Sequence, residues 1–108
     1  MAGPLIAAIG GTFRERSYSR AVLHQALDIA SSLGAQTTML DLRDFDLPMY
    51  RPDFALEDYR QEDRDAITRF LDASFACDGL IWACPTYHGT VSGLFKNALD
   101  HVEYLSEA

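Results

Sequence analysis

Short apolar runs alternate along the chain with longer stretches in which apolar residues recur every three or four positions. The runs cover residues 5–9, 36–42 and 79–84. Uninterrupted apolar or β-branched runs of this length are typical of strands that are buried on both faces, as in a parallel sheet. We therefore predict three parallel strands at these positions.

The longer stretches have the spacing of amphipathic helices. Three such helices are predicted, over residues 19–33, 58–76 and 92–105. Gly34 follows the first of them, where a glycine commonly ends a helix. Residues 43–54, which contain Pro48 and Pro52, predict a long surface loop.

This β-α-β-α-β-α order predicts an α/β fold in which helices cover a parallel sheet. Right-handed crossovers that leave the first strand in the centre give the strand order 2-1-3. Ligands of such sheets bind beyond the carboxyl ends of the strands, between strands 1 and 3. We therefore expect the functional site in the loops that follow those two strands.

Composition narrows the class of protein. The 108 residues include nine Lys and Arg against sixteen Asp and Glu, a net charge of −7. One domain spanning residues 1–108 is expected, and the acidic balance argues against nucleic acid as a partner. No apolar run approaches the roughly 20 residues of a membrane span, and the first residues lack a signal-peptide pattern, so no membrane partner and a cytoplasmic location are expected. Cys77 and Cys84 lack metal-ligand spacing, and no metal is expected.

The first candidate loop, residues 10–20, leaves a strand and enters a helix. It contains Gly10 and Gly11, the hydroxyl residues Thr12, Ser17 and Ser19, and the arginines Arg14, Arg16 and Arg20. Hydroxyls, arginines and free N–H groups at a helix N-terminus favour one phosphomonoester. The pattern is neither the ATP-binding P-loop nor the dinucleotide turn. The alternative is that a serine only caps the helix and that the arginines are solvated.

The second candidate loop follows the third strand and begins at Pro85. Its glycines allow the backbone to approach a flat heterocycle, and Tyr87 can pack against such a ring. His88 is a candidate general acid, but no partner carboxylate has a defined spacing from it, so we favour a histidine without a catalytic role. No catalytic residue is predicted.

Three motifs carry a family resemblance. Residues 11–17, Gly-Thr-Phe-Arg-Glu-Arg-Ser, resemble a G-S/T-x-R-x-x-S phosphate loop, and residues 41–48 resemble a "DLRDLPLP" stretch. Residues 85–90 and then Gly93, Lys96, Asn97 and Asp100 match P-x-Y-N/H-G-S/T-x-x-G-x-L-K-N-x-x-D, except that Phe95 stands at the leucine position. Together they make the chain similar to the N-terminal portion of the NADPH-dependent FMN reductase family.

The resemblance implies a flavodoxin-like three-layer sandwich with the complete strand order 2-1-3-4-5, so the domain is expected to be truncated before strands 4 and 5. It also implies FMN as cofactor, NADPH or NADH as co-substrate, and a small-molecule acceptor such as a quinone, flavin, azo dye or metal ion. The flavin carries this chemistry. A homo-oligomer is expected, because the family resemblance coincides with an apolar loop at Phe45, Leu47, Met49 and Tyr50.

The resemblance also assigns the cofactor-binding residues. Those of the first loop, beside the FMN phosphate, are Gly11, Thr12, Arg14, Ser17 and Ser19. Those of the second loop, along the ribityl chain and the ring, are Pro85, Thr86, Tyr87, His88 and Gly89. Two alternatives remain open: a non-catalytic flavodoxin-type electron carrier, and an inactive, flavin-free fragment that acts only by association.

Overall fold

The computed structural model describes residues 3–107, so Met1, Ala2 and Ala108 of the predicted domain lie outside the described part. Its helices and strands are β1 (Leu5–Gly10), α1 (Tyr18–Ser32), β2 (Gln36–Asp41), α2 (Gln61–Phe75), β3 (Gly79–Ala83), β4 (Thr86–Tyr87), β5 (Thr90–Val91) and α3 (Gly93–Asp100). Short 3₁₀ helices are η1 (Leu42–Asp44), directly after β2, η2 (Leu56–Asp58), before α2, and η3 (His101–Glu107), directly after α3. The three predicted strands and three predicted helices are therefore confirmed, although the third helix is α-helical only to Asp100 and continues as the 3₁₀ helix η3.

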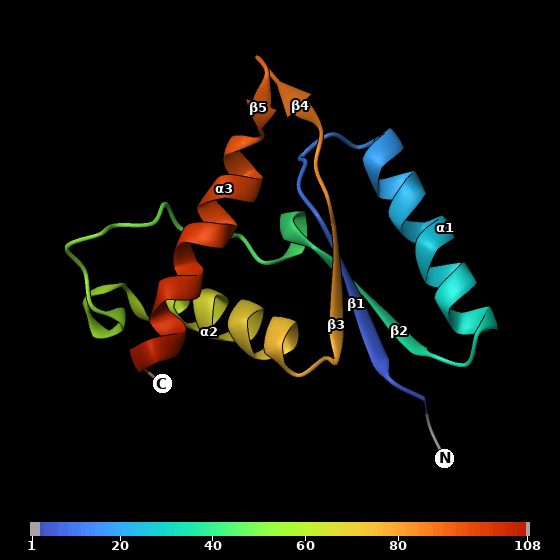
Figure 1. Ribbon diagram of the computed structural model, residues 1–108. Helices are drawn as coiled ribbons and strands as arrows, with labels where there is room; N and C mark the ends of the chain where they lie inside the picture. Colours follow the sequence, from blue (N-terminus) through green and yellow to red (C-terminus); the bar gives the residue numbers. More distant parts are fainter. Residues whose placement is uncertain (1–2, 108) are drawn as a thin grey trace.

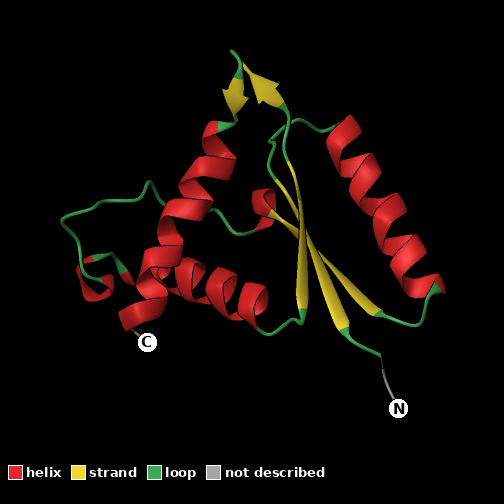
Figure 2. Ribbon diagram, in the orientation of Figure 1, coloured by secondary structure: helices red, strands yellow, loops and turns green. Residues whose placement is uncertain are grey.

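The sheet has the predicted parallel order β2-β1-β3. Figures 1 and 2 show α1 alone on one side of it and α2 with α3 on the other. This is the three-layer α/β arrangement that the pattern predicts. The loops after β1 and β3 meet at one end of the sheet, at the top of Figure 1.

The central strand β1 is buried on both faces. Ala7 and Ile9 belong to the core cluster beneath α2 and α3, whereas Ala8 packs with Leu23 and Leu27 of α1. Successive side chains of a strand point to opposite faces, so one short apolar run supplies both cores. Ala7, Ala8 and Ile9 of β1 are all completely buried.

The second candidate loop contains a small antiparallel hairpin, in which Thr86 pairs with Val91 and Tyr87 with Thr90. Its two turn residues have positive φ angles, 51° at His88 and 81° at Gly89. A two-residue hairpin turn of this kind needs left-handed backbone at both positions, which glycine adopts freely and histidine only at some cost. The Tyr-His-Gly-Thr sequence is therefore a turn signal.

The prediction that residues 43–54 form a surface loop is wrong for their apolar side chains. Phe45 is buried in the main core, and Leu47, Tyr50 and Phe54 pack against it. The prolines indicate where regular structure ends, but they do not decide whether neighbouring apolar side chains are buried. Met49 remains exposed, so this loop offers little of the apolar surface from which association was expected.

Side chains from the end of the chain hold this segment in place. Asn97 Nδ2 donates to the Pro48 carbonyl (2.9 Å), and its Oδ1 accepts from the Tyr50 N–H (2.8 Å). His101 is fully buried and its Nε2 lies 2.8 Å from the same Pro48 carbonyl. Burial lowers the pKa of His101 below its ordinary value, against the opposing effects of this hydrogen bond and of Asp100. His101 is therefore neutral at pH 7, with Nε2 donating.

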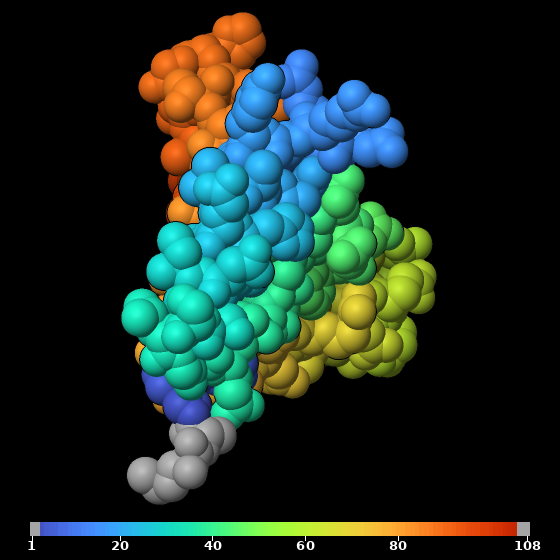
Figure 3. Space-filling model, turned by 90° about the vertical axis from the view of Figure 1, so that its right-hand side faces the viewer, coloured from blue at the N-terminus to red at the C-terminus, as the bar shows by residue number. Residues whose placement is uncertain are grey.

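The outer edge of β3 and one side of α1 are exposed. Among residues 3–107 no strand pairs with the edge of β3 that faces away from β1. The exposed large apolar side chains of α1 are Tyr18, Val22 and Ile29, and Figure 3 views the molecule from the side that α1 covers.

None of the helices within residues 3–107 has the length and hydropathy that a membrane span requires.

Candidate functional site

Three contacts join the loops that follow β1 and β3. The Gly11 N–H donates to the Ala83 carbonyl at the end of β3 (3.0 Å). The Thr12 Oγ1 lies 3.2 Å from the Tyr87 hydroxyl oxygen. Ser92 Oγ donates to the Gly11 carbonyl and also accepts from the Phe95 N–H, which caps α3. The two candidate loops are thus one connected unit.

A hollow of about 160 Å³ lies between the loops. Its lining residues are Thr12, Arg14, Ser17, Tyr18, Ser19, Pro85 and Tyr87. A wider, open hollow of about 670 Å³ involves Arg14, Ser17 and Tyr18 again, together with Arg16 and Ala21. Neither hollow is lined by a carboxylate, so the polar groups in them suit an anion.

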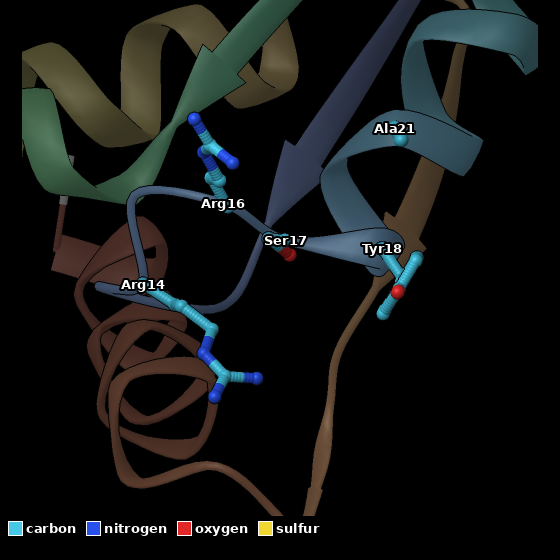
Figure 4. Close-up of a pocket in the computed structure, with 5 residues that line it drawn as sticks. All are labelled: Arg14, Arg16, Ser17, Tyr18 and Ala21. Carbon is cyan, nitrogen blue, oxygen red and sulfur yellow. The ribbon is translucent and has the colours of Figure 1, made fainter.

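The two arginines of the open hollow extend in different directions. In Figure 4 the Arg14 side chain points to one side of the loop and the Arg16 side chain to the other, with Ser17 between them. Within residues 3–107 the Arg14 guanidinium has no hydrogen bond or ion pair. Since Arg14 lines both hollows, its guanidinium is available to an anion bound there.

The start of α1 adds a partial positive charge to the same place. Ser17 is the N-cap, and its Oγ accepts from the Arg20 N–H (3.2 Å) and lies 2.9 Å from Ser19 Oγ. The first turn of α1 has no acidic residue to offset the helix dipole. The capping role left open by the sequence is therefore confirmed for Ser17, and it leaves both hydroxyls beside the hollow.

Arg20 does not belong to the anion-facing set in which the sequence grouped it. Its side chain is buried and lies 3.1 Å from Asp41, measured from Nε to Oδ2. Burial by itself raises the pKa of the Asp41 carboxyl, but the hydrogen bonds from Arg43 and the charge of Arg20 outweigh burial and lower it. Periodicity along a helix shows which face a residue occupies, not that a distant carboxylate will pair with it.

The second loop contributes to the hollow only in part. Pro85 and Tyr87 line it, but Thr86, His88 and Gly89 lie in the exposed hairpin and are not among the lining residues. Gly11 does not line the hollow either, and an added Cβ at this position would lie 3.0 Å from the Phe95 side chain in α3. Six of the ten predicted cofactor-binding residues are thus brought together around one hollow.

Sequence reasoning missed three residues that shape the site. They are Asp41, Tyr18 and Ser92. Ser92 had a signal, since a serine directly before a predicted helix is a common N-cap, but nothing local indicated its bond to Gly11. No group of three or more His, Cys, Asp or Glu side chains able to hold a metal occurs within residues 3–107.

Comparison with known proteins shows which family of proteins this chain is similar to. The family model described as NADPH-dependent FMN reductase matches residues 4–108. NADPH-dependent FMN reductase ArsH of Shigella flexneri is 27% identical over 92 residues, which cover 85% of this chain and 33% of that protein. A quinone reductase of Pseudomonas putida is 30% identical over 96 residues, which cover 88% of this chain and 47% of its own length.

A solved structure gives the same fold. FerB of Paracoccus denitrificans, a flavoenzyme NAD(P)H:(acceptor) oxidoreductase, superposes with a TM-score of 0.71 at 22% identity. The match covers 92% of this chain and 50% of FerB. The chain therefore spans half or less of the length of these three proteins.

Proposed function

Because the chain belongs to the NADPH-dependent FMN reductase family, we propose that it forms the FMN-binding part of an NAD(P)H oxidoreductase. Electrons from NADPH or NADH would reach a small-molecule acceptor such as a quinone, a flavin, an azo dye or a metal ion through the bound FMN. The observation that carries the proposal is the hollow between the two loops, whose size and donors suit one phosphomonoester.

The first loop would hold the phosphate. Thr12, Ser17 and Ser19 offer hydroxyls at the hollow, Arg14 offers a guanidinium, and α1 directs its N-terminus there. Gly11 lets this loop pack closely on α3. The donor set contains no carboxylate, and a phosphate dianion therefore meets no like charge among the lining residues.

The second loop would border the rest of the cofactor. Pro85 and Tyr87 adjoin the hollow, and the hairpin with Thr86, His88 and Gly89 continues from them. When bound, FMN supplies hydride acceptance and electron transfer. The chain's own residues bind and orient it, so we assign none of them a catalytic role.

Flavin titration tests this proposal. We expect FMN to bind more tightly than riboflavin, which lacks the phosphate. Quenching of the flavin fluorescence measures the binding of both. We also expect a longer form of the protein, in which the sheet continues beyond β3, to oxidise NADPH through bound FMN when a quinone or azo dye is present. In that longer form, FMN binding without NADPH oxidation would favour the alternative of an electron carrier. Equal affinity for the two flavins would contradict the phosphate site.

We also propose that the exposed edge of β3 pairs with a fourth parallel strand in a longer protein and that the protein forms homo-oligomers. The unpaired edge and the half-length match to relatives support the first part, since an open apolar edge favours pairing. We propose a cytoplasmic location, in keeping with two free cysteines and a reduced nicotinamide co-substrate.

Residues 1–108 expressed alone test the pairing and the association. We expect light scattering to show oligomers at micromolar concentration, and little NADPH turnover, because the flavin would lack one wall of its site. A monomer that melts cooperatively, binds stoichiometric FMN and turns over NADPH at ordinary enzyme rates would contradict both proposals.

A further inference from the structure

The buried arginine at the start of α1 organises the phosphate loop. We propose that Arg20 is a positioning residue: held by Asp41, it draws the carbonyl oxygens of the loop inward, which turns N–H groups outward and gives the site its preference for a flavin that carries a phosphate. This inference rests on the proposed function and adds a residue that would not touch the cofactor.

Three loop carbonyls converge on the guanidinium of Arg20. Its Nη1 donates to the Glu15 carbonyl (2.9 Å), and its Nη2 donates to those of Arg14 (2.8 Å) and Thr12 (3.2 Å). Only 8% of the residue is exposed. The planar fork of an arginine can serve several acceptors at once, which a lysine ammonium cannot do with the same geometry.

The direction of these carbonyls determines the direction of the neighbouring N–H groups. In a trans peptide the N–H points opposite to the C=O, and the chain contains no cis peptide bond within its described part. The N–H groups of Phe13, Glu15 and Arg16 therefore point away from Arg20. None of the three donates a hydrogen bond to another group within residues 3–107. They remain available as hydrogen-bond donors to an anion, and Arg16 itself lines the wider hollow.

Asp41 fixes the arginine from the other side. The Arg20 Nε lies 3.1 Å from Asp41 Oδ2, and each side chain is 10% exposed. Asp41 is the last residue of β2 and lies opposite Gly10 of β1 in the register. Its carboxylate is further held by Arg43, whose Nη2 lies 2.7 Å away. The loop is thus tied through Arg20 to the end of the sheet.

The two flavins separate positioning from general stability. The substitution Arg20→Lys keeps the positive charge and loses the planar fork of the guanidinium. We expect it to lower FMN affinity by about tenfold or more and to change riboflavin affinity by less than about twofold. Asp41→Asn is expected to change the same ratio in the same direction. A loss of stability alone would weaken the binding of both flavins equally.

Arg64 provides the matched control. It lies in α2, away from the loop, and its Nη2 donates to one carbonyl, that of Tyr59 (3.3 Å). Arg64→Lys is expected to leave the ratio of FMN to riboflavin affinity unchanged. Thermal melts of all three variants establish that they are folded.

The outcomes distinguish the inference from the proposed function. If the unchanged protein shows no preference for FMN, the proposed phosphate site fails. If it prefers FMN and the folded Arg20→Lys and Asp41→Asn variants keep that preference, only the role of Arg20 fails. If the variants do not fold, an NMR titration of the unchanged protein tests the inference. FMN, but not riboflavin, should shift the amide resonances of Phe13, Glu15 and Arg16. Unshifted resonances would overturn the inference.

Discussion

Replacing Arg14 by alanine is expected to weaken FMN binding by about ten- to hundredfold, because a charge-assisted hydrogen bond to the phosphate contributes about 1.5 to 3 kcal/mol. The Arg14 guanidinium lines both hollows and has no hydrogen bond or ion pair within residues 3–107. Its removal should therefore cost affinity without disturbing a contact of the folded protein. Fluorescence titration with FMN measures the effect.

Arg16 is the control for this substitution. Its side chain leaves the loop in the direction opposite to that of Arg14 and lines only the wider hollow. Arg16→Ala removes the same charge from the same loop, and we expect a smaller loss of FMN affinity. An unchanged affinity in Arg14→Ala, or equal losses in the two variants, would contradict the assignment of Arg14 to the phosphate.

Replacing Tyr104 by alanine is expected to lower the free energy of unfolding by about 3 to 5 kcal/mol, the usual range for truncating a buried aromatic side chain. Tyr104 is 1% exposed, and its hydroxyl oxygen lies 3.1 Å from both the Arg51 and the Phe54 carbonyl oxygens, which share its single proton. It also lies 2.9 Å from the Tyr59 hydroxyl. Since domains are stable by only about 5 to 15 kcal/mol, urea denaturation should show a protein close to unfolding.

Two further variants help to interpret this loss of stability: Tyr104→Phe separates the contribution of the hydroxyl from that of the ring, and Tyr18→Ala is a control. Tyr104→Phe keeps the ring and removes the hydroxyl, and it should cost about 1 kcal/mol for each hydrogen bond lost. Tyr18→Ala removes a tyrosine that is 92% exposed and should change the stability little. A Tyr104→Ala protein as stable as the Tyr18→Ala protein would show that the end of the chain does not hold the segment before α2.

The order of strands and helices was readable from the sequence because it depends on local periodicity. The apolar run of β1 supplies side chains to both cores, and the helical spacing places Leu23 and Leu27 of α1 against the sheet. Gly34, with a φ of 101°, ends α1 where a glycine is expected. The loops that follow β1 and β3 had to meet, since parallel strands end at the same edge. The hydroxyl residues of the hollow, Arg14 and Tyr87 were therefore predictable, whereas Tyr18 was not.

What the sequence did not determine are contacts between residues far apart in the chain. Arg20 and Arg14 have the same local signal, a cation near a helix start. Asp41 nevertheless pairs with Arg20, whereas Arg14 has no ion pair within residues 3–107. The burial of the segment after β2 likewise depends on Asn97 and His101, about fifty positions later. Periodicity specifies which face of an element is apolar, but the partner of a polar group depends on which elements the fold brings together. Only the tertiary structure therefore decided which arginine is buried against Asp41 and which one lines the hollow.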